Sequence, residues 1–143
     1  MGVYEFKAGR RFLVRVPKGA ELVGYITELI QKENIRQGEI TAIGAVADAA
    51  IGFYDQETHG YHEVELTGGL EIVSLTGNIS LKDGKPHLHA HAGLADHSGA
   101  MFGGHLSRAT VFLTEIVIHE FLGGEEKELE RVPDETTGLS CWT

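Results

Sequence analysis

Cysteine is scarce in this sequence: its 143 residues include one, Cys141, so the chain cannot form an internal disulfide. Small secreted domains commonly depend on several disulfides, and this chain does not belong to that class. The first residues, MGVYEFK, also lack the charged and then apolar pattern of a secretory signal peptide. These two absences together predict a cytoplasmic protein.

Long hydrophobic runs are missing as well. A transmembrane helix needs about 20 mostly apolar residues in succession, and no segment of the sequence supplies them. We therefore expect no contact with a membrane. The composition, 42% hydrophobic and 23% charged, is ordinary for a water-soluble globular chain. A length of 143 residues predicts a single domain, residues 1–143, with a hydrophobic core of its own.

Basic charge is the third shortage. Lys and Arg number 12 against 21 Asp and Glu, and the net charge is −9 when the histidines are neutral. Nucleic-acid binding draws much of its affinity from Lys and Arg on phosphates, so an acidic domain is a poor DNA-binding candidate. One tight basic cluster, Arg10-Arg11 with Arg15 and Lys18 nearby, is interpreted as the solvated end of a strand.

Several catalytic motifs are absent too. The glycine pairs at 68–69, 103–104 and 123–124 lack the GxxxxGK[ST] and GxGxxG spacing of nucleotide-binding loops. No nucleophile elbow occurs, and Ser98 and Cys141 have no evident partners for a nucleophilic triad. Neither nucleotide binding nor covalent catalysis is therefore indicated.

The spacing of apolar residues predicts one clear helix and a series of strands. The helix is expected over residues 19–33, where Leu22, Ile26, Leu29 and Ile30 form a single apolar stripe. Two short strands are expected within 3–16, around a turn at Ala8-Gly9, and one or two more within 39–54. Further strands are expected over 61–66, 70–81, 86–95 and 102–121, with a break at Gly68-Gly69 between the first two of these. A second short helix is expected near 103–109. This inventory predicts an α+β domain with a mainly antiparallel sheet.

Histidine is what the chain has in unusual concentration: five of its eight histidines lie between residues 86 and 106. His87, His89 and His91 alternate along one expected strand, so they share one face of it. Asp83-Gly84 predicts a tight hairpin before that strand. The resulting register places the three histidines opposite polar residues of the preceding strand, pairing His87 with Ser80, His89 with Asn78 and His91 with Thr76.

A second hairpin brings in one more histidine. A three-residue turn centred on Ser98, with Gly99 at positive φ, places His105 opposite His91. A bulge at Gly103-Gly104 would change this register. Directly opposed residues have Cβ atoms about 5 Å apart and diagonal ones about 7 Å, so their imidazoles can converge on one ion at about 2 Å from each nitrogen.

The pattern therefore predicts a metal site with His89, His91 and His105 as ligands. His87 lies further along the strand and is either a fourth ligand or a bystander, while Asn78 and Glu115 are candidates for assisting the site. Three imidazoles with an open position suit Zn²⁺, and Ni²⁺, Co²⁺, Cu²⁺ and Fe²⁺ accept them too. The alternative is a solvent-facing strand that happens to use histidine. The other histidines are scattered and are interpreted as loop or surface residues: His59, His62, His97 and His119.

Two segments resemble a known family, the Plants and Prokaryotes Conserved (PPC) domain, also labelled as DNA-binding. They are GGLEIVSLTGNIS (68–80) and KPHLHAHAGLADHSGAMFGGHL (85–106). AIGAV (42–46), GFYDQET (52–58) and DETTGL (134–139) are similar to the stand-alone prokaryotic members. The resemblance implies an α+β fold, with an antiparallel sheet of about seven strands flanked by helices, and a homotrimer.

The resemblance also bears on the site. The P-x-x-H-x-H and GGH elements of stand-alone members correspond here to His89, His91 and His105, and imply a bound metal, often zinc. His87 stands where relatives commonly have an apolar residue. The DNA-binding label comes largely from plant members that carry an Arg-Gly-Arg-Pro hook, which this chain lacks, and transfer of that function by fold alone is only analogy.

Three functions follow as hypotheses. The first is a cytoplasmic homotrimer that binds zinc or another divalent transition metal and acts on a small polar ligand, with or without catalysis. The second is a DNA-associated module. The third is a scaffold, because the small residues of 42–52 suit close packing between subunits. A cupin is set aside, because the glutamate that cupins place soon after H-x-H is missing and the nearby acid is Asp96.

Overall fold

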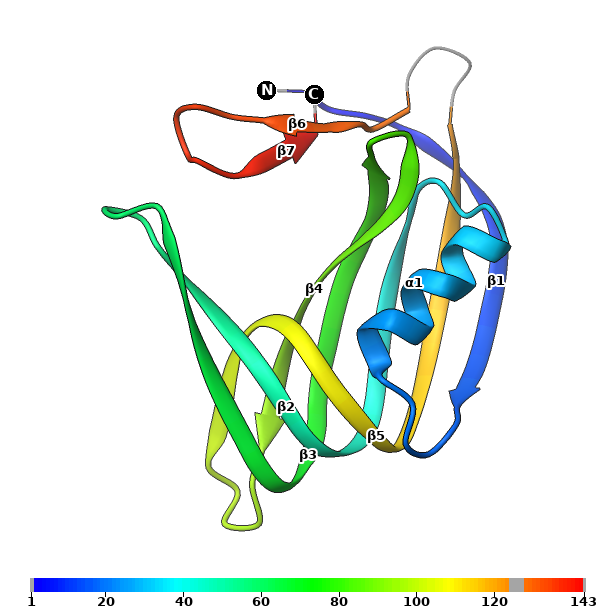
Figure 1. Ribbon diagram of the computed structural model, residues 1–143. Coiled ribbons are helices and arrows are strands. Elements are labelled where there is room, and N and C mark those ends of the chain that lie inside the picture. Colours follow the sequence, from blue (N-terminus) through cyan, green and yellow to red (C-terminus); the bar gives the residue numbers. More distant parts are fainter. Residues whose placement is uncertain (1, 124–127, 143) are drawn as a thin grey trace.

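The computed structural model describes residues 2–123 and 128–142. Within these ranges the chain forms one helix and seven strands (Figure 1). The elements are β1 (Phe6–Val16), α1 (Leu22–Lys32), β2 (Gly38–Asp55), β3 (Gly60–Lys82), β4 (Lys85–Ala95), β5 (Met101–Gly123), β6 (Arg131–Pro133) and β7 (Ser140–Trp142). Over the described part of the chain, no helix is long and apolar enough to cross a membrane.

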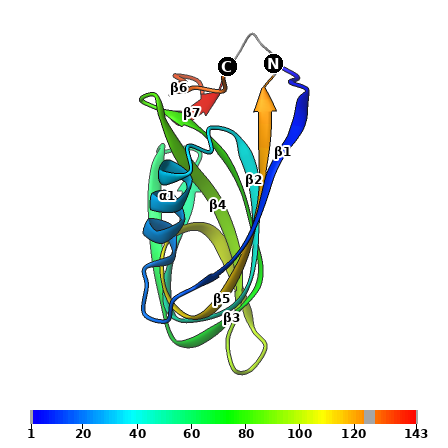
Figure 2. The same ribbon diagram turned by 90° about the vertical axis from the view of Figure 1, so that its right-hand side faces the viewer.

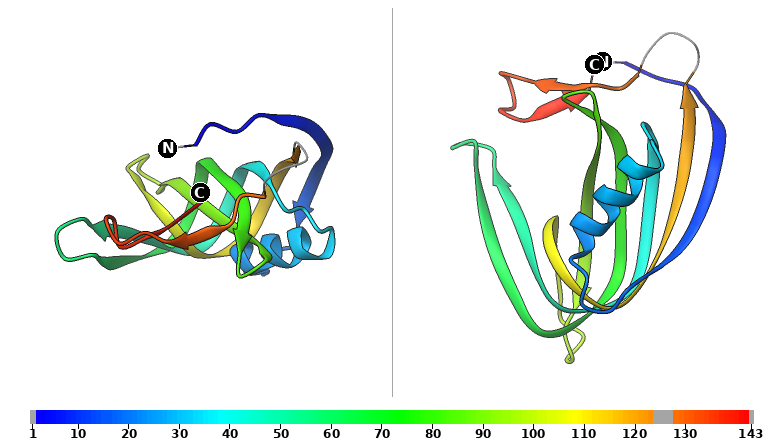
Figure 3. Two further views of the ribbon diagram at one scale, coloured as in Figure 1. Left: turned by 90° about the horizontal axis from the view of Figure 1, so that it is seen from above. Right: turned by 45° about the vertical axis from the view of Figure 1, so that its right-hand side comes forward.

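Five long strands make one antiparallel sheet in the order β1-β5-β2-β3-β4. The first residues of β5 also pair with β4, so β2, β3, β4 and β5 form a closed ring of strand pairs. The sheet is strongly curved as a result, and α1 lies against one side of it (Figures 2 and 3). The prediction of a mainly antiparallel sheet is confirmed, but one helix accompanies it in the described residues where several were expected.

The helix packs through the apolar stripe that its sequence predicts. Leu22, Ile26 and Ile30 are fully buried, while Leu29 is partly buried. The helix begins later than expected, at Leu22, because the side chain of Glu21 caps it by accepting hydrogen bonds from the backbone N–H groups of Val23 and Gly24. The rest of the core comes from alternate residues of the strands, chiefly Ile40, Leu75, Ile79, Leu94, Ile116 and Ile118.

The second short helix expected near 103–109 is wrong, because those residues belong to β5. Two other boundaries also differ. β1 is one strand with a register shift between Ala8 and Arg11 in place of a turn. β3 runs through Gly68 and Gly69, whose positive φ values of 96° and 78° bend the strand without ending it. Of the one or two strands expected within 39–54, the structure has one, β2.

The small residues of 42–52 pack within the chain. Ala42, Ala49 and Ala50 are buried in the core. At Gly44, a Cβ atom would lie 2.1 Å from the carbonyl oxygen of Leu113, so the close approach of β2 and β5 requires glycine there. Internal strand packing thus accounts for the composition that had suggested a scaffold.

Strands β6 and β7 pair as a hairpin beside the turn between β3 and β4 (Figure 1). Leu81 of β3 donates a backbone hydrogen bond to the carbonyl of Leu129, just before β6. The hairpin therefore faces the end of the sheet where the histidine strand begins.

Candidate metal centre

Both predicted hairpins position the histidines as expected. Across the β3–β4 turn, His87 pairs with Ser80, His89 with Asn78 and His91 with Thr76. Asp83 and Gly84 form this turn with φ values of 53° and 71°, as a two-residue hairpin turn of the primed type requires. The alternate residues of β4 are buried in the core, which leaves the histidines on the opposite face.

The second hairpin places His105 directly opposite His91. Pairing from His91 to Ala95 and from Met101 to His105 shows no register shift, so the glycine pair before His105 does not form a bulge. Gly104 has a steric role instead. A Cβ atom there would lie 2.7 Å from the carbonyl oxygen of Gly52, so glycine is needed where β5 passes close to β2.

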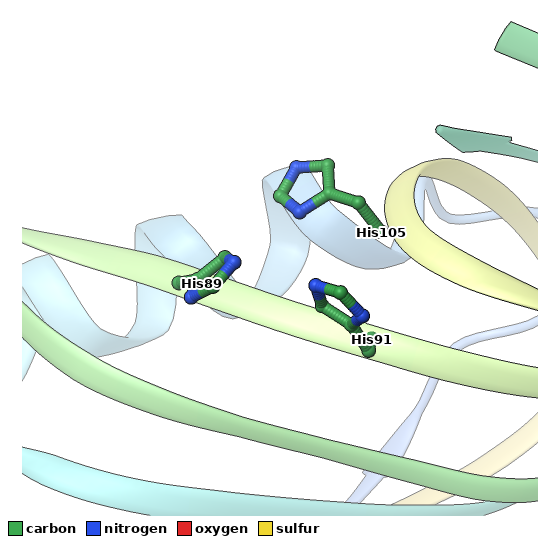
Figure 4. Close-up of side chains that lie close together, drawn as sticks. All are labelled: His89, His91 and His105. Carbon is green, nitrogen blue, oxygen red and sulfur yellow. The ribbon is translucent and has the colours of Figure 1, made fainter. Parts of the chain in front are cut away.

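The rings of His89, His91 and His105 point toward one another (Figure 4). Each residue offers one ring nitrogen, and these three nitrogens all lie within 4.8 Å of one another. The ring centroids are 5.2 Å apart for His89–His91 and His89–His105, and 5.6 Å apart for His91–His105. Two nitrogens on one tetrahedral ion are about 3.4 Å apart, so small side-chain rotations suffice for coordination.

The surroundings favour the neutral, ligating form of His89 and His105. Burial and, to a smaller extent, the positive charge of Arg131 together lower the pKa of His89 to about 4. Burial likewise lowers the pKa of His105 and of His87. Because only a neutral imidazole can bind a metal ion, His89 and His105 need not lose protons at neutral pH.

One ring nitrogen has no partner of its own. Nδ1 of His105 is buried and makes no hydrogen bond with any residue that the structure describes. A buried polar atom without a partner is costly, and such atoms commonly mark a bound ion or water. Three convergent neutral imidazoles, one of them with an unsatisfied nitrogen, fit a divalent transition metal, and these residues could hold one.

The other expected site residues lie at different distances from this cluster. His87 precedes His89 by two residues on β4 and lines the adjoining cavity, but its ring is not one of the three that converge. Asn78 lines the same cavity. Glu115 is exposed, ten residues beyond His105 on β5, between Arg15 of β1 and Ile43 of β2. The structure does not bring Glu115 to the histidines.

Arg131 is the residue at this site that the sequence did not indicate. It begins β6, and its guanidinium donates three hydrogen bonds: Nε to Ser80 Oγ at 2.8 Å, Nη1 to the Ser140 carbonyl at 2.9 Å and Nη2 to Asn78 Oδ1 at 2.8 Å. Its Cζ lies 5.0 Å from the centre of the Trp142 ring. These contacts join β3 to a hairpin about 50 residues later in the chain, and no local pattern could have signalled them.

A cavity of about 760 Å³ adjoins the cluster, within the size range of small-molecule sites. His89 and His105 lie in its wall, whereas His91 is exposed. The polar part of the wall also includes His87, Asn78 and Arg131, and the apolar part includes Tyr61, Leu139 and Trp142.

One member of the basic cluster in β1, Arg10, is already paired with carboxylates. Arg10 binds the carboxylate of Glu120 through Nε at 2.8 Å and that of Glu33 through Nη1 at 3.2 Å. The four scattered histidines also lie outside the metal cluster, as expected. His62 and His119 are near Asp55 and Glu39 respectively.

The chain is similar to one protein family and to several solved structures. The family model of the Plants and Prokaryotes Conserved (PCC) domain matches residues 3–122. The crystal structure of the metal-containing protein AF0104 from Archaeoglobus fulgidus is 44% identical, with a TM-score of 0.94, over 100% of this chain and 99% of that one. A PPC protein from Pyrococcus horikoshii is 40% identical, with a TM-score of 0.93, over 100% and 97% of the two chains.

Two more distant matches carry other names. A structure from Ralstonia eutropha JMP134, whose name proposes DNA binding, is 26% identical with a TM-score of 0.78, over 92% of this chain and 89% of that one. The bifunctional protein GlmU of Synechococcus sp. (strain JA-3-3Ab) is 30% identical over 132 residues, or 90% of this chain. The chain spans only 20% of the length of that relative.

Proposed function

The chain belongs to the Plants and Prokaryotes Conserved (PCC) domain family, and we propose that it binds a divalent transition metal through His89, His91 and His105. The observation that carries this proposal is the convergence of three ring nitrogens within 4.8 Å. We further propose that the ion faces a small polar ligand in the adjoining cavity. Three protein ligands leave a coordination position open, which is typical of catalytic sites and not of structural ones.

Zinc is the metal that we propose. Three neutral imidazoles in a tetrahedral arrangement with one open position suit Zn²⁺ well. The name of the relative from A. fulgidus states that it contains a metal, and that relative is 44% identical to this chain. A bound divalent ion would supply Lewis acidity toward the ligand. The cavity residues Asn78 and Arg131 would bind and orient that ligand.

We extend the proposal to a cytoplasmic homotrimer. Large apolar side chains are exposed on the sheet; for Ile43 the exposed fraction is 60%. Apolar patches of this kind commonly mark protein–protein contacts. The residues concerned are Leu13, Ile43, Val73, Phe112 and Leu113. The single cysteine, Cys141, is free and suits a reducing compartment.

DNA binding is the alternative that the name of the R. eutropha structure suggests. The net charge of −9 opposes it, and the carboxylates of Glu120 and Glu33 already neutralise Arg10. We therefore propose that this chain does not bind DNA, and a gel-shift titration at low salt decides the matter.

Metal content tests the main proposal. We expect purified wild-type protein, prepared without an affinity tag, to contain about one zinc ion per chain by elemental analysis. The double variant H89A/H105A removes two of the three ligands and should retain almost none. H62A/H119A is the matched control, because both of its histidines lie outside the cluster, and it should keep the wild-type amount. Equal metal content in wild type and H89A/H105A would refute the proposal.

A further inference from the structure

Arg131 carries a positive charge that no described carboxylate neutralises. Its three hydrogen bonds go to neutral acceptors, namely a hydroxyl, a backbone carbonyl and a side-chain amide. Arg10, Arg36 and Arg108, in contrast, are each paired with Asp or Glu. Arg131 is half-buried, and its guanidinium stays charged at any ordinary pH. A partly desolvated charge without a counter-ion is unfavourable unless a ligand supplies one.

The guanidinium retains donors for such a ligand. Arginine has five N–H groups, and the three hydrogen bonds leave one N–H on each of the terminal nitrogens Nη1 and Nη2. Two terminal N–H groups can bind two oxygens of one carboxylate or phosphate. Ser80, Asn78 and the Trp142 ring hold the guanidinium in place, so little side-chain entropy would be lost on binding.

The rest of the cavity wall adds positive charge and no negative charge. Lys82 lines it along with Arg131, and a metal ion on the histidines would add two further charges. The chain has 21 Asp and Glu, yet among the described residues none lines this cavity. Arg131 lines the same cavity as the proposed metal ligands His89 and His105.

We propose that the cavity binds a small ligand through an oxyanion group, carboxylate or phosphate, which contacts Arg131 beside the metal ion. The apolar remainder of the ligand would lie against Leu139, Tyr61 and Trp142. This inference rests on the proposed metal site for two of the positive charges, whereas the contact with Arg131 stands without the metal. The negative group would offset the repulsion between the guanidinium and the ion.

Trp142 makes the contact measurable. It is the sole tryptophan of the chain and lies against Arg131, so its fluorescence reports on that guanidinium. The probes are acetate, inorganic phosphate and neutral acetamide, titrated into metal-free protein and into zinc-loaded protein freed of excess ion. We expect acetate or phosphate to bind and acetamide not to, with tighter binding in the zinc-loaded form. The two anions distinguish a carboxylate site from a phosphate site.

Variants of Arg131 test the assigned residue. R131Q should weaken binding of the preferred anion by about 10-fold or more, the range for a hydrogen bond to a charged group. R131K keeps the charge without the two-nitrogen contact, so it should bind the anion more weakly than wild type and more tightly than R131Q. R108Q, which removes an exposed arginine paired with Asp48, is the control and should bind as wild type does. Circular dichroism checks folding, and if R131Q does not fold, R131K and the acetate–acetamide comparison decide.

Two results would overturn the inference: anions that bind no better than acetamide, or folded Arg131 variants that bind them as well as wild type. Failure of the metal proposal has a different signature. In that case zinc would not change anion binding, while the dependence on Arg131 would persist.

Discussion

Gly104 controls how closely β5 approaches β2 beside the metal cluster. A Cβ atom at this position would lie 2.7 Å from the Gly52 carbonyl oxygen, closer than real side chains allow. Since His105 follows directly, any displacement of the backbone at Gly104 moves a proposed ligand. The absence of a Cβ atom at Gly104 thus allows the close strand approach that positions His105.

Gly104→Ala should therefore damage both stability and metal binding. We expect the free energy of unfolding to fall by about 1–3 kcal/mol, the usual cost of forcing an extra carbon into a packed site, and zinc affinity to fall with it. Urea denaturation and a competitive zinc titration measure the two effects. Gly93→Ala in the same hairpin is the control, because its Cβ would meet Met101 Sδ at an ordinary 3.5 Å. A normal zinc affinity in G104A would contradict this account.

At the scale of elements, one carboxylate adds to the backbone pairing that joins the edge strand β1 to β5. Glu120 of β5 accepts hydrogen bonds from the backbone N–H of Arg10 at 3.0 Å and from its Nε at 2.8 Å, at the register shift in β1. The hydrogen bonds from the Arg10 side chain lower the pKa of Glu120 below its ordinary value of 4.5. The carboxylate thus satisfies a backbone donor that the irregular pairing leaves open.

This ion pair makes stability depend on pH. Because the folded pKa of Glu120 is lowered, the unfolded chain binds more protons in that range, and stability rises with pH. The contribution is present above the ordinary carboxyl pKa and is lost as pH falls through the lower folded value. Glu120→Gln should therefore destabilise the protein more at pH 7 than at about pH 3, measured by urea denaturation. Glu115→Gln, exposed on the same strand, is the control, and a pH-independent penalty in E120Q would count against this mechanism.

Local patterns were sufficient to predict some elements and not others. The Asp83-Gly84 turn and the strict alternation of side chains along 86–95 were enough to predict the register of β4, and therefore the face of the sheet on which His89 lies. The length of β3 was missed because Gly68-Gly69 is a break in most sequence contexts, whereas here pairing with β2 continues through it. Arg131 was missed because its partners Ser80 and Asn78 are set by tertiary packing.

On the scale of the whole molecule, the two faces of the curved sheet differ in how much apolar surface they bury. One face carries α1 and the core. The other leaves large apolar side chains in solvent, with Leu13 80% exposed and Ile43 60% exposed. Burial of such a face between copies of the chain would stabilise an oligomer by the hydrophobic effect.

A charge on this face should dissociate the proposed trimer. We expect wild-type protein to show three times the 15.5 kDa chain mass in light scattering, and Ile43→Asp to shift the mass toward that of one chain. Val3→Asp is the control, because Val3 is 92% exposed and precedes β1. A wild-type protein that is monomeric at all concentrations would remove the trimer from the proposal.

The C-terminal hairpin has a consequence for truncation of the chain. The imidazoles of His89, His91 and His105 come from β4 and β5, whereas Arg131 and Trp142 come from β6 and β7. Removal of the hairpin would therefore take the guanidinium from the cavity and leave every proposed metal ligand in the chain.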